Sequence, residues 1–454
     1  MNSRTSSYLI ILLLSVSFFT RPLGAQNYVT TYAGTGSAGF VNGDTSVAQF
    51  NQTFGICIDQ EGNIYLADAG NHCIRKISTA GEVTTYAGVP NQPGYLDGPA
   101  DEARFRQPFN LAMDDEGNMY VSDFLNQRIR KISADMQVTT IAGSGLAGYL
   151  EGPAMEARFN YPRGVCLDDT GNIYIGDSWN HRIRKISTDG MVSTWAGGGT
   201  TIGVQSVGDY VDASDTAARF YTPCEVSIDG DNNIFVADAY NHRIRMIAPD
   251  RMVSTLAGSG GFGPNGGGFN NGPSGEAQFD TPTALQVVLD GSVYVGDGAN
   301  HVVRKISDGM VTTFAGSGQE GFEDGPDSLA TFNFPRGNVM DYELNRLYIV
   351  DYNNYAIRIL HIVSGVGIPD DLFKAEGINI FPNPSSGKIN IDLGSHHDHI
   401  EVIVHDSMGR IVYSERYTNS REIMLKLDDQ EAGLYILDVF SDGRILAKKK
   451  LVLE

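Results

Sequence analysis

Six positions in this sequence occupy the same place in a repeated pattern yet carry different side chains. Each stands four residues after the phenylalanine of an Ala-x-Phe signal and directly follows a proline or a threonine. The six residues are Phe54, Phe109, Arg163, Cys224, Thr283 and Arg336. Guanidinium groups bind carboxylates through paired hydrogen bonds, and aromatic faces attract cations. A ligand without sixfold symmetry has to be recognised where the units differ, so these positions are the candidates for binding.

Arg163 and Arg336 are separated by three of the six units, so a closed ring would place them opposite each other across its axis. Aromatic residues at four hairpin tips would surround the same end of the ring, which we call the channel mouth. They are Phe124, Trp179, Tyr240 and Tyr352. Together with Phe54 and Phe109, these side chains predict a site for a carbohydrate or a carboxylate-bearing ligand. The alternative is that the arginines pair with local acids and the aromatic rings cap the tops of the units.

A repeated segment predicts the elements that position these residues. Its first copy is Ala67–Ile77 (ADAGNHCIRKI), and it occurs five more times in the chain. The copies lie at 122–132, 176–186, 237–247, 296–306 and 350–360. Each unit predicts four short strands bounded by turn residues. One of them, NIYLAD (63–68), is apolar on both faces, which requires neighbouring sheets on both sides. Six such units predict an all-β, six-bladed β-propeller.

The last strand of each unit, Val-Thr-Thr-x-Ala-Gly, is missing after the sixth hairpin. It occurs instead at 29–34 (VTTYAG), close to the beginning of the chain. We therefore expect this N-terminal strand to complete the sixth blade, so that the ring closes without a long unpaired edge.

Three sets of residues recur at fixed positions, and we interpret them as structural. An aspartate ends the second strand of every unit and an arginine lies in the third, where they would hold turns and pair with acids or carbonyls. The histidines share their position with Gln127 and Tyr355, and they would be spread around a ring, whereas the ligands of a metal converge. We predict no metal site and no cofactor. The histidines are His72, His181, His242 and His301.

Charge and cysteine content limit the function classes. The net charge is −21 with 41% hydrophobic residues, and an acidic chain lacks the basic footprint that nucleic-acid binding requires. Four cysteines in 454 residues are not a disulfide scaffold. Cys57 and Cys166 share a repeat position and suggest small buried side chains, with a disulfide bridge as the alternative. Cys73 and Cys224 share no repeat position.

The motif Asp-x-x-Asn-His-x-Ile-Arg-Lys-Ile resembles the NHL repeat, over about 27–363. That resemblance implies the propeller fold, but NHL-type propellers serve as RNA readers, protein-binding modules, kinase sensor domains and lyases. The peptide-amidating lyases of this fold bind zinc through histidines before the inner strand. None of the six corresponding residues in this chain is a histidine.

The C-terminal part, 375–454, predicts a small β-sandwich of about seven strands. Its segments INIFPNPSSGKINI (378–391), EVIVHDSMGRIVY (401–413) and EAGLYILDVF (431–440) resemble the sorting domain of proteins exported by the type IX secretion system of Bacteroidetes. The resemblance implies that the secretion machinery is a partner and that the protein is secreted or lies at the outer-membrane surface.

Taken together, the sequence predicts a signal peptide (1–25), a propeller (26–363), a linker (364–374) and a sorting domain (375–454). No other stretch is apolar enough to predict a transmembrane segment. The expected function is a monomeric binding module whose channel mouth takes a glycan or a peptide. The alternative is an extracellular lyase or hydrolase that acts at the same mouth. Its catalytic residues would be Arg163 or Arg336 together with Tyr240 or Tyr352.

Overall fold

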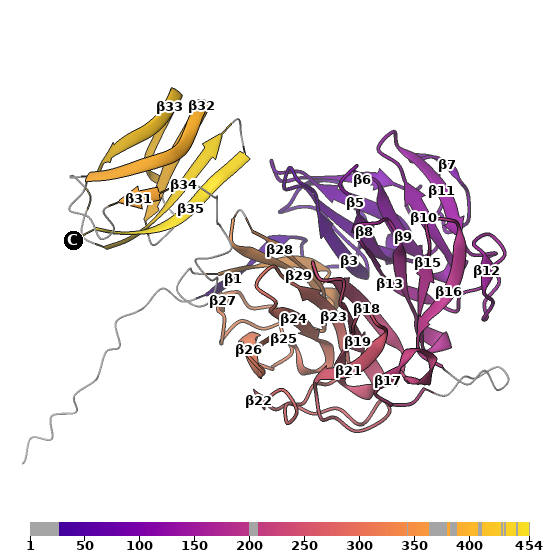
Figure 1. Cartoon of the computed structure of the whole chain (residues 1–454). Helices are drawn as coiled ribbons and strands as arrows, with labels where there is room; N and C mark the ends of the chain where they lie inside the picture. Colours follow the sequence, from indigo (N-terminus) through magenta and orange to yellow (C-terminus); the bar gives the residue numbers. More distant parts are fainter. Residues whose placement is uncertain are drawn as a thin grey trace, which may run out of the picture.

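The structure is a computed structural model, and the chain is built from strands and one-turn 3-10 helices throughout the part that it describes (Figure 1). The expected signal peptide (1–25) and linker (364–374) lie outside the described residues. None of the described helices is long and apolar enough to cross a membrane. The described residues are 27–198, 208–342, 344–362, 379–381, 388–406, 411–427, 430, 433–441 and 444–453.

Six sheets of five strands each follow one another in the chain as blades. Blade 1 contains β2 (Gly43–Asp44), β3 (Thr53–Ile58), β4 (Ile64–Asp68), β5 (Cys73–Ile77) and β6 (Glu82–Ala87). Blade 2 contains β7 (Gly98–Pro99), β8 (Pro108–Met113), β9 (Met119–Asp123), β10 (Arg128–Ile132) and β11 (Gln137–Ala142). Blade 3 contains β12 (Gly152–Pro153), β13 (Pro162–Leu167), β14 (Ile173–Asp177), β15 (Arg182–Ile186) and β16 (Met191–Ala196).

The second half of the ring repeats the arrangement. Blade 4 contains β17 (Ala213–Ser214), β18 (Pro223–Ile228), β19 (Ile234–Asp238), β20 (Arg243–Ile247) and β21 (Met252–Ala257). Blade 5 contains β22 (Gly272–Pro273), β23 (Pro282–Val287), β24 (Val293–Asp297), β25 (Val302–Ser307) and β26 (Met310–Ala315). Blade 6 contains β27 (Gly325–Pro326), β28 (Pro335–Asp341), β29 (Arg346–Asp351), β30 (Ala356–His361) and β1 (Tyr28–Ala33).

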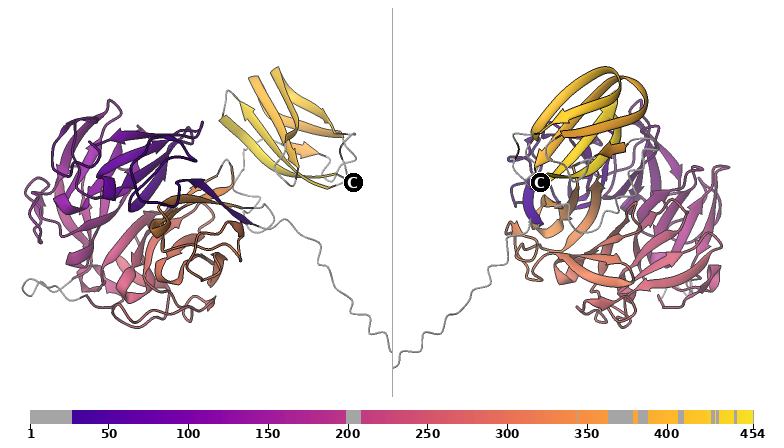
Figure 2. Two further views of the ribbon diagram at one scale, coloured as in Figure 1. Left: turned by 180° about the vertical axis from the view of Figure 1, so that it is seen from behind. Right: turned by 60° about the vertical axis from the view of Figure 1, so that its left-hand side comes forward.

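The N-terminal strand closes the ring as the sequence predicts. β1 pairs antiparallel with β30, with Val29 opposite Leu360 and Thr30 opposite Ile359. Figure 2 shows the indigo N-terminal strand beside the orange strands of the last blade. The fold is therefore a six-bladed β-propeller whose last sheet combines both ends of the repeat region.

Each blade has one strand more than the sequence suggests. In five of the six blades the additional strand is a two-residue Gly-Pro or Gly-Asp segment of the preceding loop, and it pairs with the outer strand. Blade 4 uses Ala213–Ser214 in the same place. A strand of two residues is too short to be recognised by alternation of apolar and polar residues, and it leaves only a short exposed edge.

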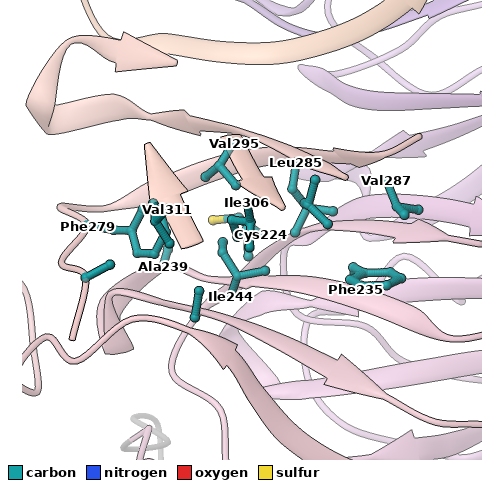
Figure 3. Close-up of a cluster of buried hydrophobic side chains, with 14 residues drawn as sticks. Cys224, Phe235, Ala239, Ile244, Phe279, Leu285, Val287, Val295, Ile306 and Val311 are labelled. Carbon is teal, nitrogen blue, oxygen red and sulfur yellow. The ribbon is translucent and has the colours of Figure 1, made fainter. Parts of the chain in front are cut away.

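Apolar contacts between adjacent blades form the core. All five residues of β4 are buried, which agrees with its two apolar faces. Figure 3 shows the cluster between blades 4 and 5, in which Ile244 and Phe235 from one blade face Leu285 and Val295 from the next. Each blade is thus packed on both sides, and the inner strands β3, β8, β13, β18, β23 and β28 surround the axis.

The recurring aspartates and arginines form one buried network per blade. In blade 2, the Asp123 carboxylate accepts hydrogen bonds from the Arg130 guanidinium (2.7 Å), the Asn126 amide (2.8 Å) and the backbone N–H of Arg106 (2.8 Å). The Asp–Arg distance is 2.7–2.9 Å in all six blades, and every one of these side chains is buried. Burial raises the pKa of Asp123, while the charge of Arg130 opposes that rise. Each network therefore joins the strands of one blade to the loop that precedes them.

The C-terminal residues form a separate sheet from β31 (Asn379–Phe381), β32 (Lys388–Asp406), β33 (Ile411–Lys426), β34 (Gly433–Ser441) and β35 (Arg444–Leu453). The first half of β32 pairs with β31 and its second half with β34, so the long strands fold the sheet over a core. That core includes Ile391, Val402, Leu425 and Leu437. The described residues contribute five strands where the sequence suggests about seven, because the two longest strands each run through both layers.

Candidate functional site at the channel mouth

The register of each blade brings the sequence-predicted residues to one end of the ring. Thr53 at the start of β3 pairs with Asp68 at the end of β4, and Pro162 pairs with Asp177 in the same way. A one-turn 3-10 helix follows that aspartate, so its side chains lie beside the first residues of the inner strands. The six helices are η1 (Ala69–Asn71), η2 (Phe124–Asn126), η3 (Ser178–Asn180), η5 (Ala239–Asn241), η6 (Gly298–Asn300) and η7 (Tyr352–Asn354).

The histidines connect neighbouring blades at this end. His242 Nδ1 accepts a hydrogen bond from the backbone N–H of Thr281 in the next blade (3.0 Å), and His301 Nδ1 accepts one from Phe334 (3.2 Å). Gln127 replaces histidine in blade 2, and its Oε1 accepts the N–H of Tyr161 (2.7 Å). The position therefore selects for a side-chain acceptor, which explains why histidine recurs there. Among the described residues, no three histidine, cysteine or acidic side chains gather as a metal site would require.

Arg336 is held by aromatic rings instead of a carboxylate. Its guanidinium carbon lies 4.3 Å from the ring centre of Tyr352, 4.6 Å from Phe54 and 4.9 Å from Phe334. Its Nε is buried without a hydrogen-bond partner, and within the described residues no acid forms an ion pair with it. The side chain is nevertheless partly exposed. The guanidinium is thus positioned and open to a ligand.

Arg163 lies in a similar environment. Its guanidinium carbon is 5.2 Å from the ring centre of Phe109 and 5.6 Å from Phe124, and its terminal nitrogen donates a hydrogen bond to Cys224 Sγ (2.8 Å). Its Nε is buried and unpaired. Cys224 itself is fully buried, so the thiol supports the arginine and does not face solvent.

The two arginines are close enough to affect each other. The pKa of Arg336 is lowered to about 10, chiefly by burial; the charge of Arg163 contributes to the lowering, while Tyr352, Cys224 and Tyr240 oppose it. The ring therefore brings together Arg163, Arg336, Tyr352 and Tyr240, which are up to 189 positions apart in the chain (352 − 163). The alternative that the arginines pair with local acids does not describe this arrangement.

A continuous series of aromatic contacts, which we call the aromatic arc, runs along one side of the mouth. Phe54 stacks on Phe109 at 4.2 Å and contacts Tyr352 at 5.0 Å. The contacts continue from Phe109 to Phe124 at 5.5 Å. The arc comprises Phe334, Tyr352, Phe54, Phe109, Phe124, Tyr161 and Trp179.

Trp179 ends the arc. Tyr161 contacts Phe124 at 4.9 Å and Trp179 at 4.5 Å. Trp179 is 49% exposed, whereas Phe109 is buried, so the arc rises from the inner strands to the surface. Such a series of ring faces suits an extended ligand with apolar faces.

Tyr240 belongs to a second aromatic group. It contacts Tyr221 at 5.2 Å, and Tyr221 stacks on Phe262 at 5.1 Å. Sequence reasoning did not include Tyr161, Phe334, Tyr221 or Phe262. Tyr161 and Phe334 occupy the residue before the proline of the inner strand, a position with positive φ in every blade. In the sequence, their shared place in the repeat, directly before the proline of the inner strand, is the signal that would have identified them.

Further polar groups lie on the inner strands, one residue after the positions that the arginines occupy in their own blades. Glu225 on β18 accepts a hydrogen bond from Asn110 on β8, two blades away. Burial raises the pKa of Glu225 to about 8, and the hydrogen bond from Asn110 opposes the rise. Gly164 on the intervening β13 allows the backbone of β18 to lie close to β13, since a Cβ at Gly164 would lie 2.6 Å from the carbonyl oxygen of Cys224. The sequence contains no local signal for this pair, because the two residues are 115 positions apart.

The hydroxyl of Thr283 and the amide of Asn338 are also buried and lack hydrogen-bond partners. Their side chains are 6% and 8% exposed. Buried polar groups without partners are uncommon in proteins, and they are one sign of a group that a ligand satisfies.

All four cysteines are unpaired in the structure. Cys73, Cys166 and Cys224 are buried, while Cys57 is partly exposed. Burial raises the pKa of the thiols of Cys57, Cys73 and Cys166. These thiols therefore stay protonated and unreactive near neutral pH.

Comparisons with family models agree with this architecture. The NHL repeat model matches residues 55–77 and 159–186, and the model of a secretion system C-terminal sorting domain matches residues 379–454. The sorting domain places the protein in type IX secretion and thus at the cell surface or outside the cell.

Known proteins are similar over the propeller. The chain is 27% identical to the chloroplastic protein SUPPRESSOR OF QUENCHING 1 of Arabidopsis thaliana, covering 68% of this chain and 30% of that protein. It is 27% identical to NHL repeat-containing protein 2 of Gallus gallus, covering 74% of this chain and 50% of the relative. The chain thus spans between 30% and 50% of the length of these relatives. An auxiliary nutrient binding protein from Bacteroides thetaiotaomicron has the same fold, with a TM-score of 0.55, 16% identity, and 74% and 76% of the two chains covered.

Proposed function

Because the chain combines an NHL-repeat propeller with a type IX sorting domain, we propose that it is an extracellular binding module whose channel mouth takes a glycan or peptide ligand. The observation that carries this proposal is the combination of the aromatic arc with two arginines that have no acidic partner in the described part of the chain. Aromatic side chains and arginine dominate the binding energy of protein interfaces, since they bury large areas and orient polar groups. The ligand-binding residues are Arg163, Arg336, Phe54, Phe109, Trp179, Tyr240 and Tyr352, joined by Tyr161 and Phe334.

Export supports an extracellular ligand. The same propeller architecture occurs in an auxiliary nutrient binding protein, although that likeness concerns the fold alone. We expect the protein to be a monomer, because the ring closes on itself through β1 and leaves no blade to be completed by a second copy.

Binding to glycan and peptide arrays tests the proposal. We expect the full-length protein to retain ligands of one class, and Trp179→Ala to weaken that binding about tenfold by removing an exposed stacking face, a loss of about 1.4 kcal/mol. Tyr28→Ala is a matched control, because Tyr28 is an exposed aromatic residue on the outer strand β1, remote from the mouth. Ligands that bind equally well to Trp179→Ala, Arg163→Ala and Arg336→Ala would place the site elsewhere.

The lyase or hydrolase alternative uses the same mouth, and it is favoured by one observation. Tyr352 and Tyr240 both lie close enough to influence the pKa of Arg336. A phenol beside a guanidinium can transfer a proton to a group that the guanidinium holds. Incubating each array ligand with the protein and analysing it by mass spectrometry separates the two functions, because a binding module returns its ligand unchanged.

A further inference from the structure

Two sets of arginines in this propeller have opposite surroundings. The six arginines of the third strands are fully buried, and each forms an ion pair with an aspartate at 2.7–2.9 Å. Arg163 and Arg336 are partly exposed and have no acidic partner among the described residues, although the chain carries a net charge of −21. Acids are abundant in this chain, so their absence beside these two arginines leaves a local positive charge uncompensated.

This positive charge is unfavourable without a ligand. Arg163 and Arg336 are like charges on the same pair of stacked rings: Arg336 lies 4.6 Å from Phe54, Arg163 lies 5.2 Å from Phe109, and these two rings are 4.2 Å apart. In agreement, the charge of Arg163 lowers the pKa of Arg336. Withdrawing a cation from water costs free energy unless an anion pairs with it. An anion between the two guanidiniums would remove both the desolvation penalty and the mutual repulsion.

The geometry of Arg336 selects among anions. Phe54 and Tyr352 have their ring centres within 4.6 Å of the guanidinium carbon, so aromatic rings already occupy part of the space around the group. The nitrogens at its edge then offer parallel donors, an arrangement that matches the two oxygens of a planar carboxylate. Thr283 lies at the equivalent inner-strand position of the blade before Arg336, and its buried hydroxyl lacks a partner.

We propose that the mouth binds an acidic oligosaccharide, with the carboxylate of a uronic acid between Arg163 and Arg336 and the neighbouring sugar rings stacked on the aromatic arc. This inference rests on the proposed function and names its ligand class. The arc supports a sugar more than a peptide, because it offers ring faces, whereas an extended peptide requires backbone donors and acceptors along its length. The arc leads away from Arg336 through Phe54 and Phe109 towards the exposed Trp179, which gives the chain of sugars its direction.

Calorimetric titration of the full-length protein tests the inference with three sets of oligosaccharides of equal length. They are oligogalacturonates, the uncharged methyl esters of the same oligomers, and oligomers of uncharged sugars to which a sulfate ester has been added. We expect the oligogalacturonate to bind at least tenfold more tightly than the methyl ester. Arg163→Gln and Arg336→Gln should each weaken oligogalacturonate binding at least tenfold and leave the methyl ester within twofold of the wild-type value.

Two further variants control for charge. Arg336→Lys keeps the positive charge but loses the paired donors, so oligogalacturonate binding should stay weak. Arg104→Gln removes one positive charge from an exposed loop residue and should leave binding unchanged. Melting temperatures of the four variants within a few degrees of the wild type would show that each of them folds.

The outcomes separate this inference from the proposed function. Equal affinity for the acid and its methyl ester, with both lost in Trp179→Ala, would overturn the carboxylate assignment while supporting the binding module. Equal affinity for the sulfated oligomers would also overturn it, since the site would then be a general anion site. Binding of peptides but of no oligosaccharide would overturn the glycan, and binding of neither class would overturn the proposed function as well.

Discussion

Arginine performs two tasks in this protein, and its immediate neighbours decide which one. Arg130 is buried against Asp123 and Asp97, at 2.7 and 2.6 Å, and its charge is balanced within the blade. Arg336 is surrounded by rings and its charge is unbalanced. The same side chain therefore stabilises the fold in one environment and is free to bind a ligand in the other.

The contribution of the buried pair can be measured in blade 2. We expect Asp123→Ala to lower the free energy of unfolding by about 3–5 kcal/mol, because it leaves the charge of Arg130 buried without its fully buried carboxylate partner. Asp97→Ala removes the other carboxylate of the same arginine, which is 37% exposed, and should cost about 1 kcal/mol or less. Urea unfolding of both variants measures the difference. Equal losses would show that the buried pair has no special role.

The element that joins one blade to the next at the mouth is the one-turn helix with its capping residue. His242 has a φ of 54°, and this left-handed conformation directs its ring towards the following blade. Its Nδ1 accepts the N–H of Thr281, and its Nε2 lies 2.7 Å from the carbonyl oxygen of Gly263, to which it donates. These hydrogen bonds fix where β23 begins and hence where Thr283 lies.

Replacing this histidine should loosen the start of β23. We expect His242→Ala to cost about 2 kcal/mol of stability, because it leaves the partly buried N–H of Thr281 without its acceptor. His242→Gln should cost less than half as much, since Gln127 accepts the equivalent hydrogen bond in blade 2. Amide hydrogen exchange at Thr281 provides the local measurement, with faster exchange in the alanine variant only. Unchanged exchange in that variant would contradict the assigned role.

At the scale of the whole molecule, the closed ring brings Arg163 and Arg336 to the same stacked pair of rings, Phe54 and Phe109. Blade 6 is made of strands from both ends of the repeat region, and β1 contributes the fully buried Val29 and nearly fully buried Ala33 to the core. Opening this junction would separate blade 6 from blade 1 and with them Arg336 from Phe54. Ligand binding should therefore depend on a strand that does not contact the ligand.

Closure can be tested within β1 itself. We expect Val29→Asp to lower stability by at least about 3 kcal/mol, because it buries an unpaired carboxylate. Tyr28→Asp introduces the same group one residue earlier, where the side chain is 45% exposed, and should be nearly neutral. Thermal unfolding and limited proteolysis compare the two variants. A small effect of Val29→Asp would mean that the ring is closed by other contacts.

Much of the architecture could be predicted because each blade repeats the same local pattern. The double-sided apolar strand NIYLAD, the hairpins and the displaced VTTYAG segment determined the blade number and the closing strand. The repeat also separated the invariant Asp–Arg residues from the variable positions of the inner strands. It did not reveal the two-residue strands such as Gly98–Pro99, since two residues carry no periodicity.

The sequence by itself determined which residues begin the inner strands, because a sixfold repeat assigns equivalent positions without any coordinates. Only the tertiary structure decided that no acid of the described segments pairs with Arg163 or Arg336, that Tyr161 and Phe334 complete the aromatic arc, and that Glu225 reaches Asn110. These contacts depend on side-chain direction and on distances across the axis. Neither follows from the repeat, because residues brought together by ring closure come from different blades and share no local pattern.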